Sequence, residues 1–168
     1  METTTVKESG FLDSVEVSKE NQNVLHPLSS RQMGLWIYQQ KHPKSNLYNI
    51  CSSFLIKSQL NLKEIANIAR KVCDLHPAFR TRFTLYRGVP KQQILPKWPG
   101  EISVHSRDES LCVTEQLSAL NRIPFNDSDG LYCRVNIVTC PDNHFIVQYS
   151  VHHILGDAKT GGIVGDAL

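Results

Sequence analysis

Two adjacent histidines followed by an aspartate form the cluster in this sequence that is best suited to chemistry. His152, His153 and Asp157 come at the end of a run of strand-forming residues. A neutral imidazole has a reference pKa of about 6.5, so it can act as a base or a hydrogen-bond partner near pH 7. Because side chains alternate along a strand, the two histidines face opposite sides if the strand continues through them. We therefore expect one histidine to serve the chemistry and the other the structure.

Other interpretations of these histidines stay open on the residues alone. Most histidines in proteins are core or surface residues with a satisfied hydrogen bond. A metal site built from His144, His152, His153 and Asp157 is conceivable, but no ligand spacing specifies it. The chain also has five cysteines, at positions 51, 73, 112, 133 and 140. They contain no CxxC pair and their number is odd, so they indicate neither a zinc site nor a disulfide framework, and we expect reduced, mostly buried thiols in a cytoplasmic protein.

The elements that must position the histidines alternate between helix and strand. A helix is predicted over residues 31–40, capped by Ser29 or Ser30 and ending by His42. A strand follows over 46–58. The next helix has Asn61 as its N-cap, Glu64 three residues later as in a capping box, and an apolar face made of Leu62, Ile65, Ala66, Ala69, Val72 and Cys73.

The second half of the chain is richer in strands. Residues 80–96 predict two strands around a turn at 88–90, and 102–106 predict a short strand. A helix is expected in the segment 110–125, ending near Pro124, and then a turn at 126–130. Residues 131–153 predict a hairpin of two long strands joined at 141–143, and the two faces of its second strand alternate. This mixture favours an α/β sandwich, with helices packed on a mixed sheet.

Length and composition set further limits. The chain has 168 residues, 40% hydrophobic and 20% charged, which is typical of one globular domain. A net charge of +2 gives no reason to expect binding to nucleic acid or to anionic membranes. No apolar run approaches the roughly 20 residues of a membrane helix, and no signal peptide is evident. Residues 1–24 hold five acids, two cations and few large apolar residues, so we expect a disordered tail.

Three segments, in the same order, resemble the motifs of the condensation domains of nonribosomal peptide synthetases. Residues 29–36 are similar to the first motif, SxAQxR(L/M)W, and 76–83 to the second, RHExLRTxF. Residues 152–157 resemble the third, HHxxxDG, whose shorter form HxxxD occurs in many acyltransferases. The matching positions are Ser29, Gln32, Leu35 and Trp36, then His76, Arg80, Thr81 and Phe83, then His152, His153 and Asp157. The resemblance covers residues 25–168.

The chain departs from these motifs at several positions. Arg31 and Gly34 replace the usual Ala and Arg of the first motif, and Leu75 and Pro77 replace Arg and Glu of the second. Ala158 replaces the final Gly of the third. The chain is also short: a condensation domain of this family has two chloramphenicol-acetyltransferase-like lobes with the reaction tunnel between them. The resemblance is to the N-terminal lobe only, so one wall of the tunnel is missing.

The resemblance implies an activity and a set of residue roles. The family joins two thioester-bound substrates, each held on the 4′-phosphopantetheine arm of a carrier domain, by forming an amide. His153 falls on the catalytic position, as a base or by orienting the amine. His152 and Asp157 are implied to be structural, with Asp157 pairing with an arginine for which Arg80 is the candidate; a surface cation is the alternative for Arg80. The backbone N–H of Ala158 is implied to help the oxyanion.

The same resemblance limits the subtype and the partners. Heterocyclisation domains replace the histidine pair with an aspartate pattern, so cyclisation is not expected, whereas epimerisation domains share HHxxxDG. Expected partners are carrier domains and the missing C-terminal lobe, with no directly bound cofactor and no metal. Two alternatives remain: a non-catalytic lobe that docks a carrier protein, and another HxxxD acyltransferase that uses acyl-coenzyme A. Gln32 and Trp36 are interpreted as ordinary helix packing.

Overall fold

The computed structural model describes residues 24–125, 130–141 and 143–156. Four sequence predictions therefore lie wholly or largely outside the described residues: the tail at 1–24, the turn at 126–130, Asp157 and Ala158. The described elements, in chain order, are β1 (His26–Pro27), α1 (Ser30–Lys41), β2 (Asn49–Lys57), α2 (Leu62–Leu75), the 3₁₀ turn η2 (Pro77–Arg80), β3 (Thr81–Tyr86), β4 (Val89–Ile94), β5 (Ile102–Ser106), α3 (Val113–Asn121), β6 (Cys133–Thr139) and β7 (His144–His152).

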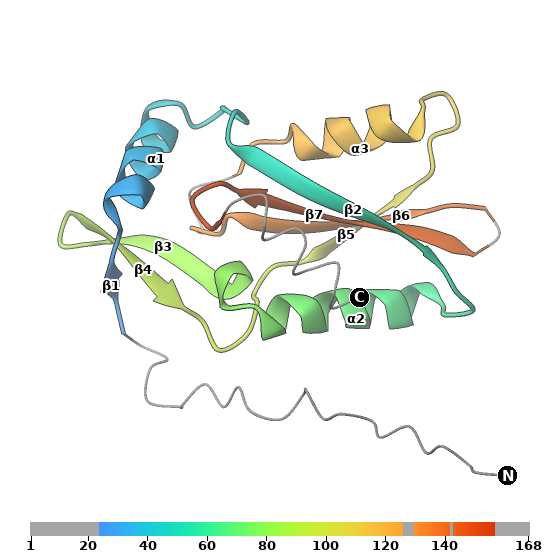
Figure 1. Cartoon of the computed structure of the whole chain (residues 1–168), viewed down its shortest axis with the longest axis horizontal. Helices are drawn as coiled ribbons and strands as arrows, with labels where there is room; N and C mark the ends of the chain where they lie inside the picture. Colours follow the sequence, from blue (N-terminus) through green and yellow to red (C-terminus); the bar gives the residue numbers. More distant parts are fainter. Residues whose placement is uncertain (1–23, 126–129, 142, 157–168) are drawn as a thin grey trace, which may run out of the picture.

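The strands form two sheets. The larger sheet has the order β2-β7-β6-β5, in which β5 and β6 are parallel and the other pairs are antiparallel. The predicted mixed sheet and the predicted β6–β7 hairpin are both confirmed. A second, antiparallel sheet of order β1-β4-β3 stands beside the first, close to α1 (Figure 1). This division into two sheets was not predicted from the sequence.

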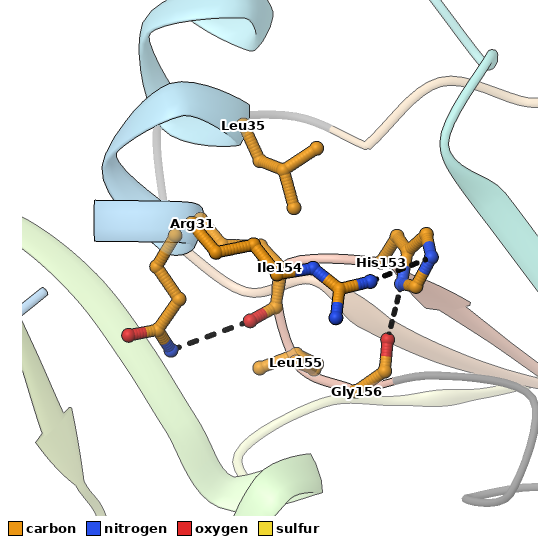
Figure 2. A pocket seen from close by; sticks show the side chains of 7 residues that line it. Arg31, Leu35, His153, Ile154, Leu155 and Gly156 are labelled. Carbon is orange, nitrogen blue, oxygen red and sulfur yellow. Dashed lines mark hydrogen bonds between the residues drawn. The ribbon is translucent and has the colours of Figure 1, made fainter. Parts of the chain in front are cut away.

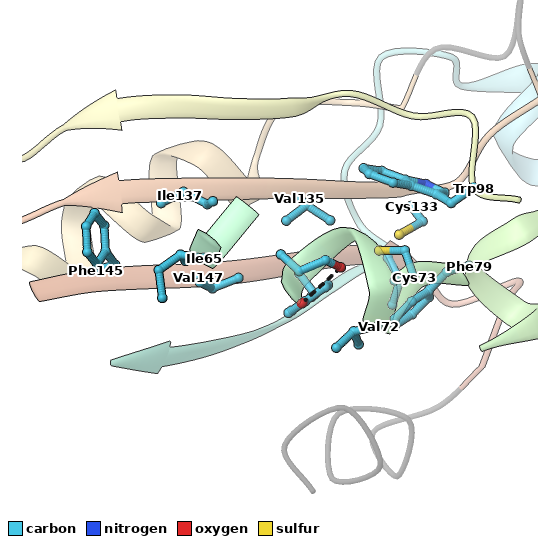
Figure 3. Close-up of a cluster of buried hydrophobic side chains, with 13 residues drawn as sticks. Ile65, Val72, Cys73, Phe79, Trp98, Cys133, Val135, Ile137, Phe145 and Val147 are labelled. Atoms are coloured by element: carbon cyan, nitrogen blue, oxygen red, sulfur yellow. Dashed lines mark hydrogen bonds between the residues drawn. The ribbon is translucent and has the colours of Figure 1, made fainter. Parts of the chain in front are cut away.

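Helix α2 covers one face of the larger sheet, while α3 lies over the opposite face (Figure 1). Asn61 and Glu64 close the predicted capping box at the start of α2: Asn61 N donates to Glu64 Oε2 at 2.8 Å, and Glu64 N donates to Asn61 Oδ1 at 3.1 Å. The apolar stripe of α2 then packs on the sheet, as predicted (Figure 3). The core on this face consists of Ile65, Ala69, Val72, Cys73, Phe79, Trp98, Cys133, Val135, Ile137, Phe145, Val147, Tyr149 and Val151.

The other face of β7 carries polar side chains beneath α3. Gln148 is fully buried and donates from Nε2 to the carbonyl of Leu117 in α3 at 2.9 Å. Its Oε1 accepts from Nδ2 of Asn136 in β6 at 3.3 Å. These bonds satisfy polar groups that would otherwise destabilise the interior. The alternation predicted for β7 is therefore confirmed: Val147, Tyr149 and Val151 lie on the α2 face.

Three local predictions need correction. The turn between β3 and β4 is Arg87–Gly88, both with positive φ (51° and 76°), and not 88–90. Pro90 belongs to β4 because β1 pairs only with Lys91 and Gln92, which leaves Pro90 at an edge where proline is tolerated. Helix α3 is shorter than expected and ends at Asn121. The cysteines are free, but they are not mostly buried: Cys73 and Cys133 are buried, Cys51 and Cys112 are exposed, and Cys140 is intermediate.

Candidate functional site

Backbone hydrogen bonds to two neighbouring segments hold the two histidines at the end of β7. His152 is the last residue of the strand, and its backbone N–H donates to the carbonyl of Tyr132 at 2.9 Å. The next N–H, of His153, donates to the carbonyl of Tyr48 at 2.8 Å, and Leu155 N then closes a turn on the carbonyl of His152 at 3.0 Å. The strand ends at His152 and does not continue through both histidines, but their side chains still enter different surroundings.

His152 points into the interior. It is 1% exposed and is surrounded by the rings of Tyr132, Tyr48 and Phe125, at centroid distances of 5.1, 5.8 and 6.4 Å. Its Nδ1 accepts a hydrogen bond from the backbone N–H of Ile154 at 3.1 Å, which holds the turn after the strand. Burial away from water, with a smaller effect of His153, lowers the pKa of His152 to about 4. The side chain is therefore neutral at pH 7 and supports the loop.

His153 is half-buried and lies at a small cavity (Figure 2). Its Nδ1 lies 2.5 Å from the carbonyl oxygen of Gly156. A carbonyl only accepts, so Nδ1 must carry the proton, and Nε2 of the neutral ring must hold the lone pair. Nε2 lies 3.2 Å from Nη2 of Arg31, which donates to it. The cavity of about 260 Å³ is lined by Arg31, Gln32, Leu35, His153, Ile154, Leu155 and Gly156.

Helix α1 forms the opposite wall of this cavity, and Gln32 holds it in place. Ser29 and Gln32 form a capping box at its N-terminus. The amide of Gln32 also donates to the carbonyl of Ile154 at 3.3 Å and to Oε1 of Gln92 in β4 at 3.0 Å. Gln32 thus ties the turn after β7 to both α1 and the small sheet. Its interpretation as ordinary helix packing misses this contact with the histidine turn.

Arg80 is a buried residue rather than a surface cation. It is 4% exposed at the junction of η2 and β3, and its Nη1 donates to the carbonyl of Leu95. Its Nε has no hydrogen-bond partner among the described residues. Asp157 and Ala158 lie outside those residues, so the Arg80–Asp157 pairing stays a prediction.

The structure argues against the conceivable metal site. No group of three or more potential ligands gathers anywhere in the described ranges. His144 and His152 stand at opposite ends of the nine-residue strand β7, roughly 26 Å apart at 3.3 Å per residue. One ion cannot bind both. Nor does any described helix have the length and apolar character needed to cross a membrane.

Comparisons with known proteins identify the family. The sequence model of the condensation domain matches residues 22–168. The chain belongs to the condensation-domain family. Similar curated proteins include a linear gramicidin synthase of Brevibacillus parabrevis, 30% identical over 82% of this chain and 3% of that protein, and bacitracin synthase 3 of Bacillus licheniformis, 27% identical over 90% and 2%. The chain thus spans only a few per cent of the relatives it matches.

Solved condensation domains have the same fold as this lobe. The starter condensation domain of the rhizomide synthetase is 20% identical, with a TM-score of 0.75 over 86% of this chain and 37% of that one. The first condensation domain of the calcium-dependent antibiotic synthetase is 17% identical, with a TM-score of 0.71 over 88% and 38%. The resemblance to the N-terminal lobe of a condensation domain, with its α/β sandwich, is confirmed.

Arg31 is the residue that sequence reasoning missed. It departs from the first motif of the condensation family, and no role was expected for it. In the structure, its guanidinium lies against the ring nitrogen of the catalytic candidate, 122 positions away in sequence. The departure from the motif was the one signal in the sequence that could have drawn attention to it.

Proposed function

We propose that this chain supplies His153 to an amide-forming condensation reaction between two carrier-bound thioesters. The observation that carries the proposal is the orientation of the His153 ring. Nδ1 donates to Gly156, so that the lone pair of Nε2 faces the cavity beside α1. An imidazole held in one tautomer and orientation is what a positioned base or hydrogen-bond acceptor requires.

In the proposed reaction, the acceptor amine attacks the carbonyl carbon of the donor thioester. A C–N bond forms, the C–S bond breaks, and the released phosphopantetheine thiol takes the proton that the amine loses. Nε2 of His153 receives a hydrogen bond or the proton from the amine during this transfer. A base of this kind contributes about 10²–10⁴-fold, and holding both reactants in one tunnel contributes more.

The partners in this proposal are the carrier domains that bring the two phosphopantetheine arms and the rest of the condensation domain. The chain binds no cofactor directly in this scheme. We place the reaction in the cytoplasm, where the five free thiols stay reduced. The backbone N–H of Ala158 is proposed to donate to the developing oxyanion.

The test is amide formation between two loaded carrier proteins. We expect no turnover from the 168-residue chain alone, because it provides one wall of the tunnel, and turnover when the complementary lobe is added. His153→Ala in that mixture should lower the rate by at least about 100-fold. Turnover by the chain alone, or an unchanged rate for His153→Ala, contradicts the proposal. Carrier binding without turnover even with both lobes present supports the docking lobe instead.

Arg80 and Asp157 are proposed to form the pair that holds the loop after His153. The supporting observation is the burial of the Arg80 guanidinium with an Nε that has no partner in the described ranges. Removing one partner of such a pair typically costs about 3–5 kcal/mol. Arg80→Ala and Asp157→Ala should therefore destabilise the chain similarly. The double variant should lose much less than the sum, as measured by urea unfolding. Additive losses mean that the two side chains do not meet.

A further inference from the structure

The lone pair of the catalytic candidate is already occupied in this structure. The Nε2 of His153 has one lone pair, and Nη2 of Arg31 donates to it at 3.2 Å. The other ring nitrogen is committed to the Gly156 carbonyl and carries a proton, so it cannot substitute. No substrate amine can make its hydrogen bond to Nε2 until the guanidinium moves away.

The position of Arg31 explains why this contact can break. Arg31 lies in the first turn of α1, which has no acidic side chain, and a cation there is disfavoured by the helix dipole. It makes no ion pair within the described residues, and its one described side-chain hydrogen bond is to His153. Its side chain is exposed at the cavity (Figure 2). An exposed single hydrogen bond is weak, so the guanidinium can be displaced at small cost.

We propose that Arg31 is a gating residue that covers Nε2 of His153 and must be displaced by the acceptor amine. This inference rests on the proposed function, because the acceptor amine is the group from which Nε2 is proposed to accept a hydrogen bond or a proton. Arg31 competes with the substrate for one lone pair. Its removal should therefore strengthen apparent binding of the acceptor by about threefold to tenfold, the factor that one ordinary hydrogen bond supplies.

The first experiment measures access to Nε2 in the 168-residue chain itself. Diethyl pyrocarbonate acylates an unprotonated imidazole nitrogen, and peptide mass mapping gives the rate at each histidine. Arg31→Met keeps the length of the side chain but removes the charge and the donors, and Arg31→Lys keeps the charge with a compact donor. We expect Arg31→Met to raise the His153 rate by about threefold to tenfold, and Arg31→Lys by less.

The exposed His26 and His42 of the same chain are the internal references, and their rates should not change. Equal His153 rates in the original chain and in Arg31→Met overturn the gate. A second measurement needs no variant: ¹⁵N–¹H correlation spectra of the neutral rings should show a proton on Nδ1 of His153. A proton on Nε2 instead leaves no lone pair for Arg31 and also overturns it.

Kinetics then separate the gate from the proposed function. With the complementary lobe present, Arg31→Met should lower the KM for the acceptor about threefold to tenfold and leave kcat unchanged. A lower kcat with unchanged KM means that Arg31 acts in the transition state, which overturns gating. If the acylation rates change as expected but no amide forms in any mixture, the contact stands and the proposed reaction fails.

Discussion

The two neighbouring histidines lie in regions of opposite character. His152 is enclosed by three aromatic rings, and Ile154, which its Nδ1 helps to position, packs with Phe83, Phe125 and Tyr132 in a second apolar cluster. His153 borders a cavity whose other wall is α1. Their tautomers are also opposite, because His152 accepts at Nδ1 and His153 donates from it. Two consecutive residues thus place one ring in the packed interior and the next ring at the edge of a cavity.

This difference shows that the two histidines of the motif have different surroundings: one stabilises the turn after β7, and the other borders the cavity. The buried ring fixes the turn by accepting the Ile154 N–H, and the turn then aims the next ring. Substitutions in the enclosed region should therefore change stability, while those at the cavity should change chemistry and leave stability nearly unaltered.

The largest loss of stability is expected for a substitution at Gly130, two residues before Tyr132, whose ring packs against His152. The φ of Gly130 is +66°, and an added Cβ would clash with the backbone carbonyl oxygen of Phe83. Gly130→Ala combines left-handed strain with this backbone clash, so we expect it to lower the free energy of unfolding by about 4 kcal/mol. Urea unfolding measures this. A loss below about 1 kcal/mol would mean that the packing around His152 adjusts to the added methyl group. The surroundings of His152 would then be no more rigid than those of His153.

A somewhat smaller loss of stability is expected when the pH is lowered. Unfolded His152 binds a proton below pH 6.5, whereas the folded state binds one only below about pH 4. Between these values the unfolded chain holds more protons, so stability should fall as pH falls, by about 3 kcal/mol over the full window. The measurement is urea unfolding at about pH 7, 5.5 and 4.5, comparing the original chain with His152→Gln.

His76 is the control for that experiment. Burial also lowers its pKa, so it contributes to the loss in the same direction. His76→Gln should remove part of the pH dependence and His152→Gln the larger part. A pH dependence that His152→Gln leaves intact contradicts a neutral, enclosed His152.

The smallest effect, of opposite sign, is expected on the cavity side. Gly34 lies inside α1, three residues beyond Arg31, and an added Cβ meets nothing within 4 Å. Gly34→Ala should stabilise the chain by about 0.5–1 kcal/mol through helix propensity alone. Thermal unfolding compares it with Gly130→Ala. Destabilisation by Gly34→Ala would show that this side is packed as tightly as the other.

Local signals made much of this arrangement predictable. The capping box of Asn61 and Glu64 predicted the start of α2, and alternation predicted the two faces of β7, because both depend on neighbours within a few residues. The contact between Arg31 and His153 was not predictable, since it joins a helix start to a strand end far along the chain. The β3 and β4 strands were predicted, but their separation into a small sheet was not, because strand pairing depends on contacts between distant segments. Strand β1 was missed because two residues are too few to form a pattern.

The division of work between the histidines is tested most directly by urea unfolding of His152→Ala and His153→Ala in the same chain. Removing the enclosed ring leaves a cavity and an unpaired Ile154 N–H, so we expect His152→Ala to lose about 3 kcal/mol. Removing the half-buried ring should cost His153→Ala less than about 1 kcal/mol. Equal losses, or a larger loss for His153→Ala, would show that the two roles are assigned the wrong way round.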